Sequence, residues 1–285
     1  MRLRQARTVV RPATLAEAWR ARDQLGSAAR FLGGGVDLAL LAPSGVTTLI
    51  DLSRLDLSYT RTADEWLRIG ATTTMTEAIE SPWVGAHAQG FLRDVLRQVA
   101  SPLQRNLATL GGTLARAHPW SDVIPALLVL DAELLLYDGA ENTLTLERFL
   151  EERGKSGAPL IAEIRLPALP EGSRGAFVKF TRTAFDVGML NVACLGAIEQ
   201  QKWTGVRIAI GGTPALATRL RAVERMLEGK PVGADQIASA ASAASGAIDA
   251  RDDRRASAGY RRTLAGELTA RCLLEIAELP ERTSP

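Results

Sequence analysis

Two short glycine runs constrain this chain more than any other feature of its sequence. One lies in Asn106-Leu-Ala-Thr-Leu-Gly-Gly-Thr113 and the other in Phe31-Leu-Gly-Gly-Gly-Val-Asp-Leu38, directly after an apolar stretch. Adjacent glycines let backbone amides approach a charged ligand with no Cβ in the way, and Thr109 and Thr113 add hydroxyl donors. A single run of this kind is usually only a tight turn. Two runs, with Asp122 downstream, indicate one long diphosphate ligand held from both sides, a dinucleotide.

The glycine runs differ from the two common nucleotide fingerprints. Neither has the spaced G-x-G-x-x-G of a Rossmann fold, and no G-K-S/T follows as in a P-loop. Pro119-Trp-Ser-Asp122 is typical of a helix start, and the N-terminal dipole of such a helix favours an anion. The chain is therefore expected to hold its ligand with a different kind of phosphate loop.

Composition argues against several classes of function. The 285-residue chain has a net charge of only +2, which gives no electrostatic case for nucleic acid. Aspartates interrupt the locally basic stretch Arg251–Arg262, which is interpreted as a solvated helix face. Cys194 and Cys272 are too few for an iron–sulfur cluster and are expected to be small core side chains rather than a disulfide framework. His87 and His118 stand alone, so no catalytic metal is expected.

No targeting or membrane segment is recognised in the sequence. Met1-Arg-Leu-Arg-Gln5 is charged and leads into no apolar core of a signal peptide. No run approaches the roughly 20 apolar residues of a membrane span. A cytoplasmic chain with no membrane span is therefore expected.

Periodicity and turn signals divide the chain into three parts. Residues 1–55 predict a small β-α-β unit, with Gly33–Gly35 at the turn from strand to helix. Residues 56–168 alternate strands and helices, among them an apolar helix at Val123–Leu130. A linker rich in proline and glycine leads to residues 173–282. There the pattern predicts an antiparallel sheet and then helices, with strands at 177–181, 191–199 and 203–211 and helices at 214–229, 234–248 and 257–279.

No nucleophile–base pair, G-x-S-x-G motif or recognisable carboxylate pair occurs, so the chemistry is expected to belong to the bound ligand. Asp122 has two interpretations, either a helix N-cap or an acceptor for ribose or ribityl hydroxyls. Lys179, which precedes Arg182 and Asp186, is either a solvated strand lysine or a cation that stabilises an electron-rich ring at a domain junction.

Taken in order, these segments closely resemble the flavin-binding subunit of the molybdenum hydroxylases. That family includes the medium subunit of aerobic carbon monoxide dehydrogenase and the FAD domain of xanthine dehydrogenase. Its A-G-G-T-D-L-L loop is similar to Leu32–Leu38, and its N-x-A-T-x-G-G-N-L-x-x-A-x-P-x-x-D segment is similar to Asn106–Asp122. Three weaker matches complete the ordered set, at Lys179–Asp186, Gly211–Arg219 and Tyr260-Arg-Arg262. The resemblance covers about residues 6–275.

The resemblance implies an α+β protein with an FAD-binding fold of the vanillyl-alcohol-oxidase type. Two lobes, residues 1–55 and 56–168, would clasp FAD, and a C-terminal α/β domain with an antiparallel sheet, residues 173–282, would cover the ring. The diphosphate contacts would come from the two glycine runs, a ligand hydroxyl would bind Asp122, and three further residues would meet the adenine or the ring. Carried over by position, the cofactor-binding residues are Phe31, Leu32, Gly33, Gly34, Gly35, Val36, Asp37, Leu38, Val99, Thr109, Leu110, Gly111, Gly112, Thr113, Asp122, Ile161 and Lys179.

In such complexes electrons pass from a molybdenum centre through two [2Fe–2S] clusters to this FAD, then to NAD+, oxygen or a quinone. The expected partners are therefore a molybdenum-cofactor large subunit and a [2Fe–2S] small subunit, and this chain would carry FAD and no metal. A cysteine-rich insertion for a [4Fe–4S] cluster, present in some relatives, is excluded by the two cysteines. The chain departs from the family pattern at Val36, Thr113 and Trp120, where Thr or Ser, Asn and a small residue are usual.

Two other functions stay open at this point. A stand-alone flavin oxidoreductase of the same fold would need a general acid near the flavin, and no sequence feature marks one. A scaffold subunit that binds no flavin is the second alternative.

Overall fold

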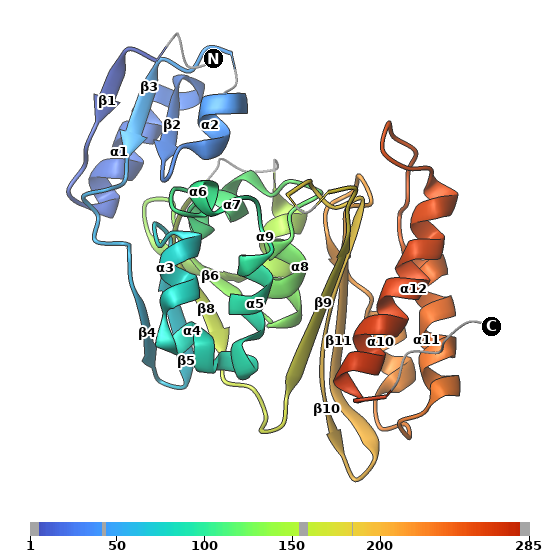
Figure 1. Ribbon diagram of the computed structural model, residues 1–285. Helices are drawn as coiled ribbons and strands as arrows, with labels where there is room; N and C mark the ends of the chain where they lie inside the picture. Colours follow the sequence, from blue (N-terminus) through green and yellow to red (C-terminus); the bar gives the residue numbers. More distant parts are fainter. Residues whose placement is uncertain (1–5, 42–43, 154–158, 184, 280–285) are drawn as a thin grey trace. The chain divides into compact units, whose positions relative to one another are not determined.

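The computed structural model describes residues 6–41, 44–153, 159–183 and 185–279, so the charged N-terminal segment 1–5 lies outside the described residues. Contacts divide the chain into two compact units, each built from several segments (Figure 1). Unit 1 comprises residues 1–84, 101–116 and 132–167. Unit 2 comprises residues 85–100, 117–131 and 168–285. No helix in the described ranges combines the length and the hydropathy needed to cross a bilayer.

Unit 1 begins with a three-stranded parallel sheet in the order β1-β3-β2. Its apolar strand residues pack on the first helix, which begins after Thr14, whose side chain accepts from the amide of Glu17, and ends at Gly26. The turn from the second strand into the next helix is the Gly33–Gly35 run, as the sequence predicted. The elements are β1 (Thr8–Val10), α1 (Leu15–Leu25), a 3-10 turn (Gly26–Ala28), β2 (Ala29–Leu32), α2 (Val36–Leu41) and β3 (Thr48–Asp51).

The rest of unit 1 is built on a five-stranded antiparallel sheet in the order β4-β5-β8-β6-β7. The T-x-x-E spacing at Thr74–Glu77 predicts a capping box. Helix α3 begins with one, because Thr74 and Glu77 each bond the other's backbone amide. The strands are β4 (Thr60–Ala63), β5 (Trp66–Gly70), β6 (Glu133–Tyr137), β7 (Glu141–Thr145) and β8 (Leu160–Pro167). The helices are α3 (Met75–Glu80), α4 (Pro82–Ala86, which runs on into residues of unit 2), α6 (Pro102–Arg105), α7 (Leu110–Arg116) and α9 (Leu146–Glu152).

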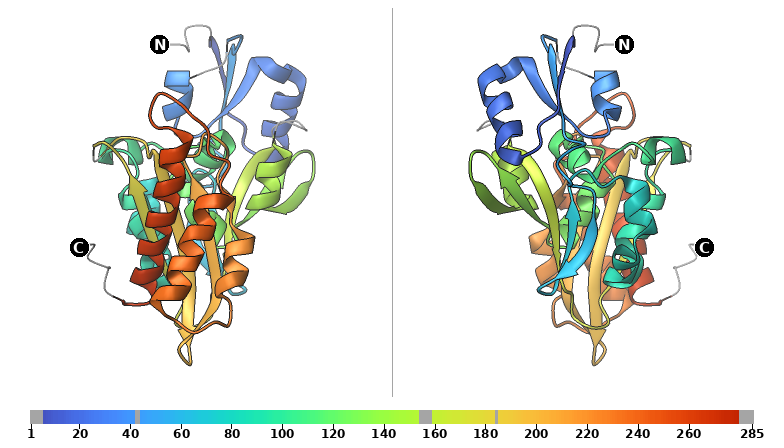
Figure 2. Two further views of the ribbon diagram at one scale, coloured as in Figure 1. Left: turned by 90° about the vertical axis from the view of Figure 1, so that its right-hand side faces the viewer. Right: turned by 90° about the vertical axis from the view of Figure 1, so that its left-hand side faces the viewer.

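Unit 2 is an antiparallel sheet with helices on both faces, in the strand order β12-β11-β10-β9. Figure 2 shows the C-terminal helices lying side by side over the sheet. Eight consecutive residues of β10, from Leu190 to Ala197, are buried, which requires cover on both faces. The strands are β9 (Arg174–Phe180), β10 (Leu190–Glu199), β11 (Lys202–Gly211) and β12 (Thr218–Arg219). The helices are α5 (Phe91–Arg97, after a 3-10 turn at His87–Gly90), α8 (Val123–Val129), α10 (Arg221–Leu227), α11 (Ala234–Ala247) and α12 (Ala258–Ile276).

Separate sheets with helices packed on them make this an α+β protein, as predicted. Two predictions of local structure are wrong. The helix expected from Pro214 begins only at Arg221, because Thr218 and Arg219 first pair with β11 as a short strand. The basic stretch expected to be one solvated helix face is a loop up to Ser257, which caps α12, and Arg261 within the helix is 1% exposed.

Candidate functional site

The two glycine runs meet inside unit 1. A Cβ built on Gly34 would stand 1.5 Å from the carbonyl oxygen of Leu107, and one on Gly33 would stand 2.7 Å from the hydroxyl oxygen of Thr109. Neither position has room for a side chain while the loops keep this contact. From the sequence, ligand approach was the only role expected for these glycines. The structure adds a second reason for glycine at these positions, which is that the two loops pack directly on each other.

The second run is more regular than expected, because Leu110–Arg116 is helix α7 and includes both glycines. The amides of Leu110 and Gly111 donate to the carbonyls of Thr73 and Ala71, at 3.0 and 2.9 Å. A Cβ on Gly111 would lie 2.6 Å from the Cβ of Ala71. Gly111 is therefore a packing glycine that fixes the start of α7 against the segment after β5.

The hydroxyls of the second run are used within the run. Thr109 accepts from the amide of Gly112 at 3.2 Å, and the Thr113 hydroxyl donates to the Thr109 carbonyl at 3.0 Å. Thr113 was expected to offer a ligand a donor in place of the family's Asn. In this structure its hydroxyl proton is already donated to the Thr109 carbonyl. The hydroxyls thus hold the loop in shape.

Backbone donors are available in the first run. Within the described ranges, the backbone amides of Gly33, Gly34 and Gly35 donate to no other residue. Gly35 has a φ of +75°, a conformation that other residues adopt at a cost. Successive free amides in a side-chain-free turn form a concave donor surface for an anion. These features fit a diphosphate group.

Asp122 is buried in unit 2 and does not cap its helix. It stands at the N-cap of α8 with no side-chain capping bond, so that interpretation is wrong. Its Oδ2 pairs with the ammonium of Lys179 at 3.0 Å, and its Oδ1 accepts from the Asn191 side chain at 2.8 Å. Burial raises the pKa of Asp122, and the positive charge of Lys179 opposes part of that rise.

Lys179 is not the solvated strand lysine of the other interpretation, since its side chain is 8% exposed. Its ammonium also donates to the backbone carbonyl of Gln98 at 2.6 Å, so it joins β9 to the end of α5 and to the start of α8. A buried ammonium with two acceptors is held in one place, as a positioned cation requires.

Asn191 was not among the site residues predicted from the sequence, and the two glycines at the end of β11 were noted only as part of the Gly211–Arg219 family match. Asn191 pairs in register with Gly211, where a Cβ would lie 2.4 Å from the Asn191 amide oxygen. Gly212 has a φ of +79°, and its amide donates to the carbonyl of Pro119 at 2.8 Å. The signal that could have marked Asn191 is an asparagine inside an otherwise apolar strand.

The structure places the expected site residues in two groups. In unit 1 it brings together Phe31–Leu38 and Thr109–Thr113, and that unit also holds Ile161, which is 5% exposed on β8. In unit 2 it brings together Asp122 and Lys179, and that unit also holds Val99.

No metal site is present in the described part of the chain, where no cluster of three His, Cys, Asp or Glu occurs. Cys194 and Cys272 are buried in the core of unit 2, as expected for small core side chains. They lie closer together than their sequence positions suggested, and burial together with the Cys272 neighbour raises the pKa of Cys194. A thiol in that setting is a poor nucleophile.

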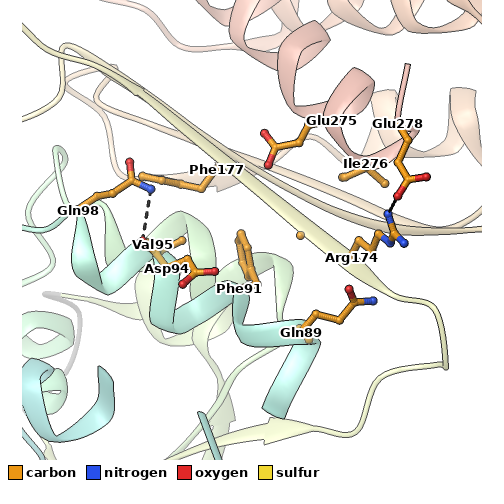
Figure 3. A pocket seen from close by; sticks show the side chains of 12 residues that line it. Gln89, Phe91, Asp94, Val95, Gln98, Arg174, Phe177, Glu275, Ile276 and Glu278 are labelled. Atoms are coloured by element: carbon orange, nitrogen blue, oxygen red, sulfur yellow. Dashed lines mark hydrogen bonds and ion pairs between the residues drawn. The ribbon is translucent and has the colours of Figure 1, made fainter. Parts of the chain in front are cut away.

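A cavity of about 310 Å³ lies in unit 2 against α5, β9 and the end of α12 (Figure 3). Phe91 and Phe177 give it apolar walls, and Asp94, Glu275 and Glu278 bring carboxylates. Its one lining cation, Arg174, is paired with Glu278. Burial raises the pKa of Glu275, whose carboxylate borders the cavity. The charge of this cavity disfavours a phosphate group.

Comparison with known proteins decides the class of the site. Residues 4–169 match the model of the FAD-binding domain in molybdopterin dehydrogenases, and residues 175–276 match that of the C-terminal domain of the CO dehydrogenase flavoprotein. The chain belongs to the molybdopterin dehydrogenase FAD-binding family. Both glycine runs and Asp122 lie inside the FAD-binding match, and Lys179 lies inside the C-terminal match.

Relatives in this family cover nearly the whole chain. The carbon monoxide dehydrogenase medium chain of Hydrogenophaga pseudoflava is 28% identical over 92% of this chain and 94% of its own length. The glyceraldehyde dehydrogenase medium chain of Sulfolobus acidocaldarius is 27% identical, covering 87% of this chain and 90% of the relative. A solved structure of the Hydrogenophaga pseudoflava CO dehydrogenase matches with a TM-score of 0.91 and 27% identity, over 96% of this chain and 98% of that one.

Membership of the molybdopterin dehydrogenase FAD-binding family identifies FAD as the cofactor. It also confirms the expected enzyme class, because the relatives are subunits of dehydrogenases. The free amides of Gly33–Gly35, beside a contact that excludes side chains, fit the diphosphate of that cofactor.

Proposed function

We propose that this protein is the electron-transfer subunit of a molybdenum hydroxylase complex. It takes electrons from the [2Fe–2S] clusters of a partner subunit and delivers them to an external acceptor such as NAD+, oxygen or a quinone. The observation that carries the proposal is the meeting of two glycine runs, with free amides in the first, inside a matched FAD-binding domain. FAD, when bound, can exchange electrons singly and in pairs.

The chain's own residues hold and orient the cofactor in this proposal. The free amides of Gly33–Gly35 donate to the diphosphate, within a binding surface formed by Phe31–Leu38 and Thr109–Thr113. Thr109 and Thr113 act mainly by keeping the second run in shape, because their hydroxyls already bond within it. Val99 and Ile161 contact the adenine or the ring.

Asp122 and Lys179 act as one unit toward the cofactor. Asp122 accepts from a ligand hydroxyl through lone pairs that Lys179 and Asn191 leave free. Lys179 supplies a fixed positive charge, held by the Gln98 carbonyl as well as by Asp122. Both groups are pre-organised, so the bound ligand would not have to order them.

The proposal includes partners and a location. A molybdenum-cofactor large subunit carries the substrate pocket, a small subunit carries the [2Fe–2S] clusters, and the complex is cytoplasmic. The functional parts are the lobes 1–55 and 56–168 with the C-terminal domain 173–282. Support comes from relatives whose names identify medium chains of such dehydrogenases, and from their coverage of nearly the whole chain.

Turnover with and without partners tests this function. The FAD-loaded full chain and the copurified complex are assayed with purines, aldehydes and aromatic heterocycles. The complex is expected to oxidise one class, whereas the chain alone should oxidise none and should still pass electrons between FAD and an artificial acceptor. Substrate oxidation by the isolated, metal-free chain would favour a stand-alone flavin oxidoreductase. A chain that binds no flavin would favour the scaffold alternative.

A further inference from the structure

A second pocket of unit 2 lies beside Trp120. The pocket holds about 320 Å³, which is at the small end for ligand sites. Trp120 is 36% exposed, and its ring stacks on His118 with ring centres 4.6 Å apart. The pocket therefore has a flat aromatic wall, held in place from behind, with room for a group the size of one nucleotide.

In the loop that faces Trp120, each carboxylate already has a partner in the loop or in helix α12. Asp249 pairs with Arg251 at 2.6 Å, and Asp253 pairs with buried Arg261 at 2.8 Å. Asp252 accepts from the amide of Ala258 at the start of α12, at 2.6 Å. Each acid of this loop is thus neutralised by an arginine or bound to a helix terminus.

Two cations are left over, and both line the pocket. Neither Arg254 nor Arg255 lies within 4.0 Å of a carboxylate oxygen of any described residue, although the charge of Arg255 contributes to the lowered pKa of Asp186. The Arg255 guanidinium instead lies over the Trp120 ring, 5.4 Å from its centre. Asp253 accepts from the amides of Arg255 and Ala256, which fixes the loop that presents both side chains.

We propose that this pocket binds a planar aromatic group that carries a phosphate, of mononucleotide size. The aromatic ring stacks on Trp120, taking the place that the Arg255 guanidinium now occupies. Arg254 and Arg255 bond the phosphate, for which the arginine fork is suited. The site uses none of the residues assigned to FAD, so it does not depend on the proposed electron-transfer function.

Binding to the FAD-saturated full chain tests the site, with AMP, adenosine and inorganic phosphate as the probes. AMP is expected to bind while the flavin absorbance shows that FAD stays in place, and adenosine and phosphate should each bind at least about tenfold more weakly. Arg254→Gln with Arg255→Gln should weaken AMP binding about tenfold or more. Trp120→Leu should weaken it about fivefold or more. Arg262→Gln, an exposed cation of the same stretch outside the pocket, is the matched control and should leave AMP binding unchanged.

Several results would overturn the inference. These are no AMP binding, equal binding of AMP and adenosine, AMP binding that the Trp120 and arginine variants leave intact, and displacement of FAD by AMP. Loss of FAD in the same variants would assign the pocket to the flavin site and also overturn it. If the double variant fails to fold, Arg254→Gln and Arg255→Gln are tested as single variants. FAD occupancy is read on every sample, so failure of the flavin assignment is seen separately.

Discussion

The ammonium of Lys179 lies 3.0 Å from the carboxylate of Asp122, and each of these side chains is only 8% exposed. The pair joins the end of β9, the first strand of the C-terminal sheet, to the N-cap residue of α8. Removing either partner of an ion pair buried to this degree destabilises the fold, because the remaining charge is then buried without a counter-charge and without solvent.

Removing the cation should be costly for that reason. Lys179→Met leaves the Asp122 carboxylate buried with only Asn191 as its partner, and we expect the free energy of unfolding to fall by about 3 to 5 kcal/mol. Lys179→Met combined with Asp122→Asn should recover most of the loss. The measurement is urea unfolding of the flavin-free chain. Arg182→Met, which breaks the exposed pair with Asp186, is the control and should cost less than about 1 kcal/mol. If Lys179→Met and the control Arg182→Met lost similar amounts of unfolding free energy, this account of the pair would be contradicted.

Asp122 should also contribute to flavin affinity. Asp122→Ala removes an acceptor for a ligand hydroxyl, so we expect FAD binding to weaken by about 1 to 3 kcal/mol. Titration of the flavin-free chain with FAD gives the affinity, and circular dichroism shows whether the variant is folded. A folded variant with unchanged FAD affinity would restrict Asp122 to a structural role.

The contact between the glycine runs can be tested by stability alone. In Gly34→Ala the new methyl group meets a backbone carbonyl, that of Leu107, which has no rotamer to escape into. We expect the free energy of unfolding to fall by about 1 to 3 kcal/mol. Gly246→Ala in α11 is the control, because a Cβ there meets nothing within 4 Å. The control should be neutral or stabilising, and equal stabilities of the two variants would show that the runs do not pack as described.

Tyr59 predicts an alkaline limit to stability. Its hydroxyl donates to the buried carboxylate of Glu163 at 2.7 Å, and burial together with that carboxylate raises the pKa of Tyr59 to about 12 from an ordinary value of 10.0. The folded chain therefore holds this proton more tightly than the unfolded chain. The stabilisation should be complete below pH 10.0 and be lost as the pH rises toward about 12.

Ultraviolet titration of tyrosinate measures this directly. The chain has three tyrosines, and Tyr59→Phe should remove the one that titrates last. The variant should also lose less stability than the wild type over the same pH range. A titration curve that Tyr59→Phe leaves unchanged at its alkaline end would refute the assignment.

Local sequence signals predicted much of the fold. The capping pair Thr74 and Glu77, the glycine turn before α2 and the long strands of unit 2 are each set by residues close in sequence, so they could be recognised. The helix expected from Pro214 failed because the pairing of Thr218 and Arg219 with a distant strand overrides local helix propensity. Pairing with a distant strand can hardly be recognised from a short stretch of sequence.

The contacts within the candidate site could not be predicted from the sequence. The glycine runs were singled out as ligand loops, but their contact with Leu107 and Ala71 depends on segments far apart in the chain. Asp122 and Lys179 are 57 residues apart, so their ion pair could not be read from spacing. The same holds for Arg261, which looked like part of a solvated face and in fact bonds the buried carbonyl of Met189.

The central claim, that the two meeting glycine runs hold FAD, is tested most directly by the FAD content of the full chain. FAD per chain is measured after reconstitution, for the wild type, Gly34→Ala and Gly246→Ala. The account predicts one FAD per chain in the wild type and in Gly246→Ala, and little or none in Gly34→Ala with the fold retained. A folded Gly34→Ala chain that keeps a full complement of FAD would contradict it.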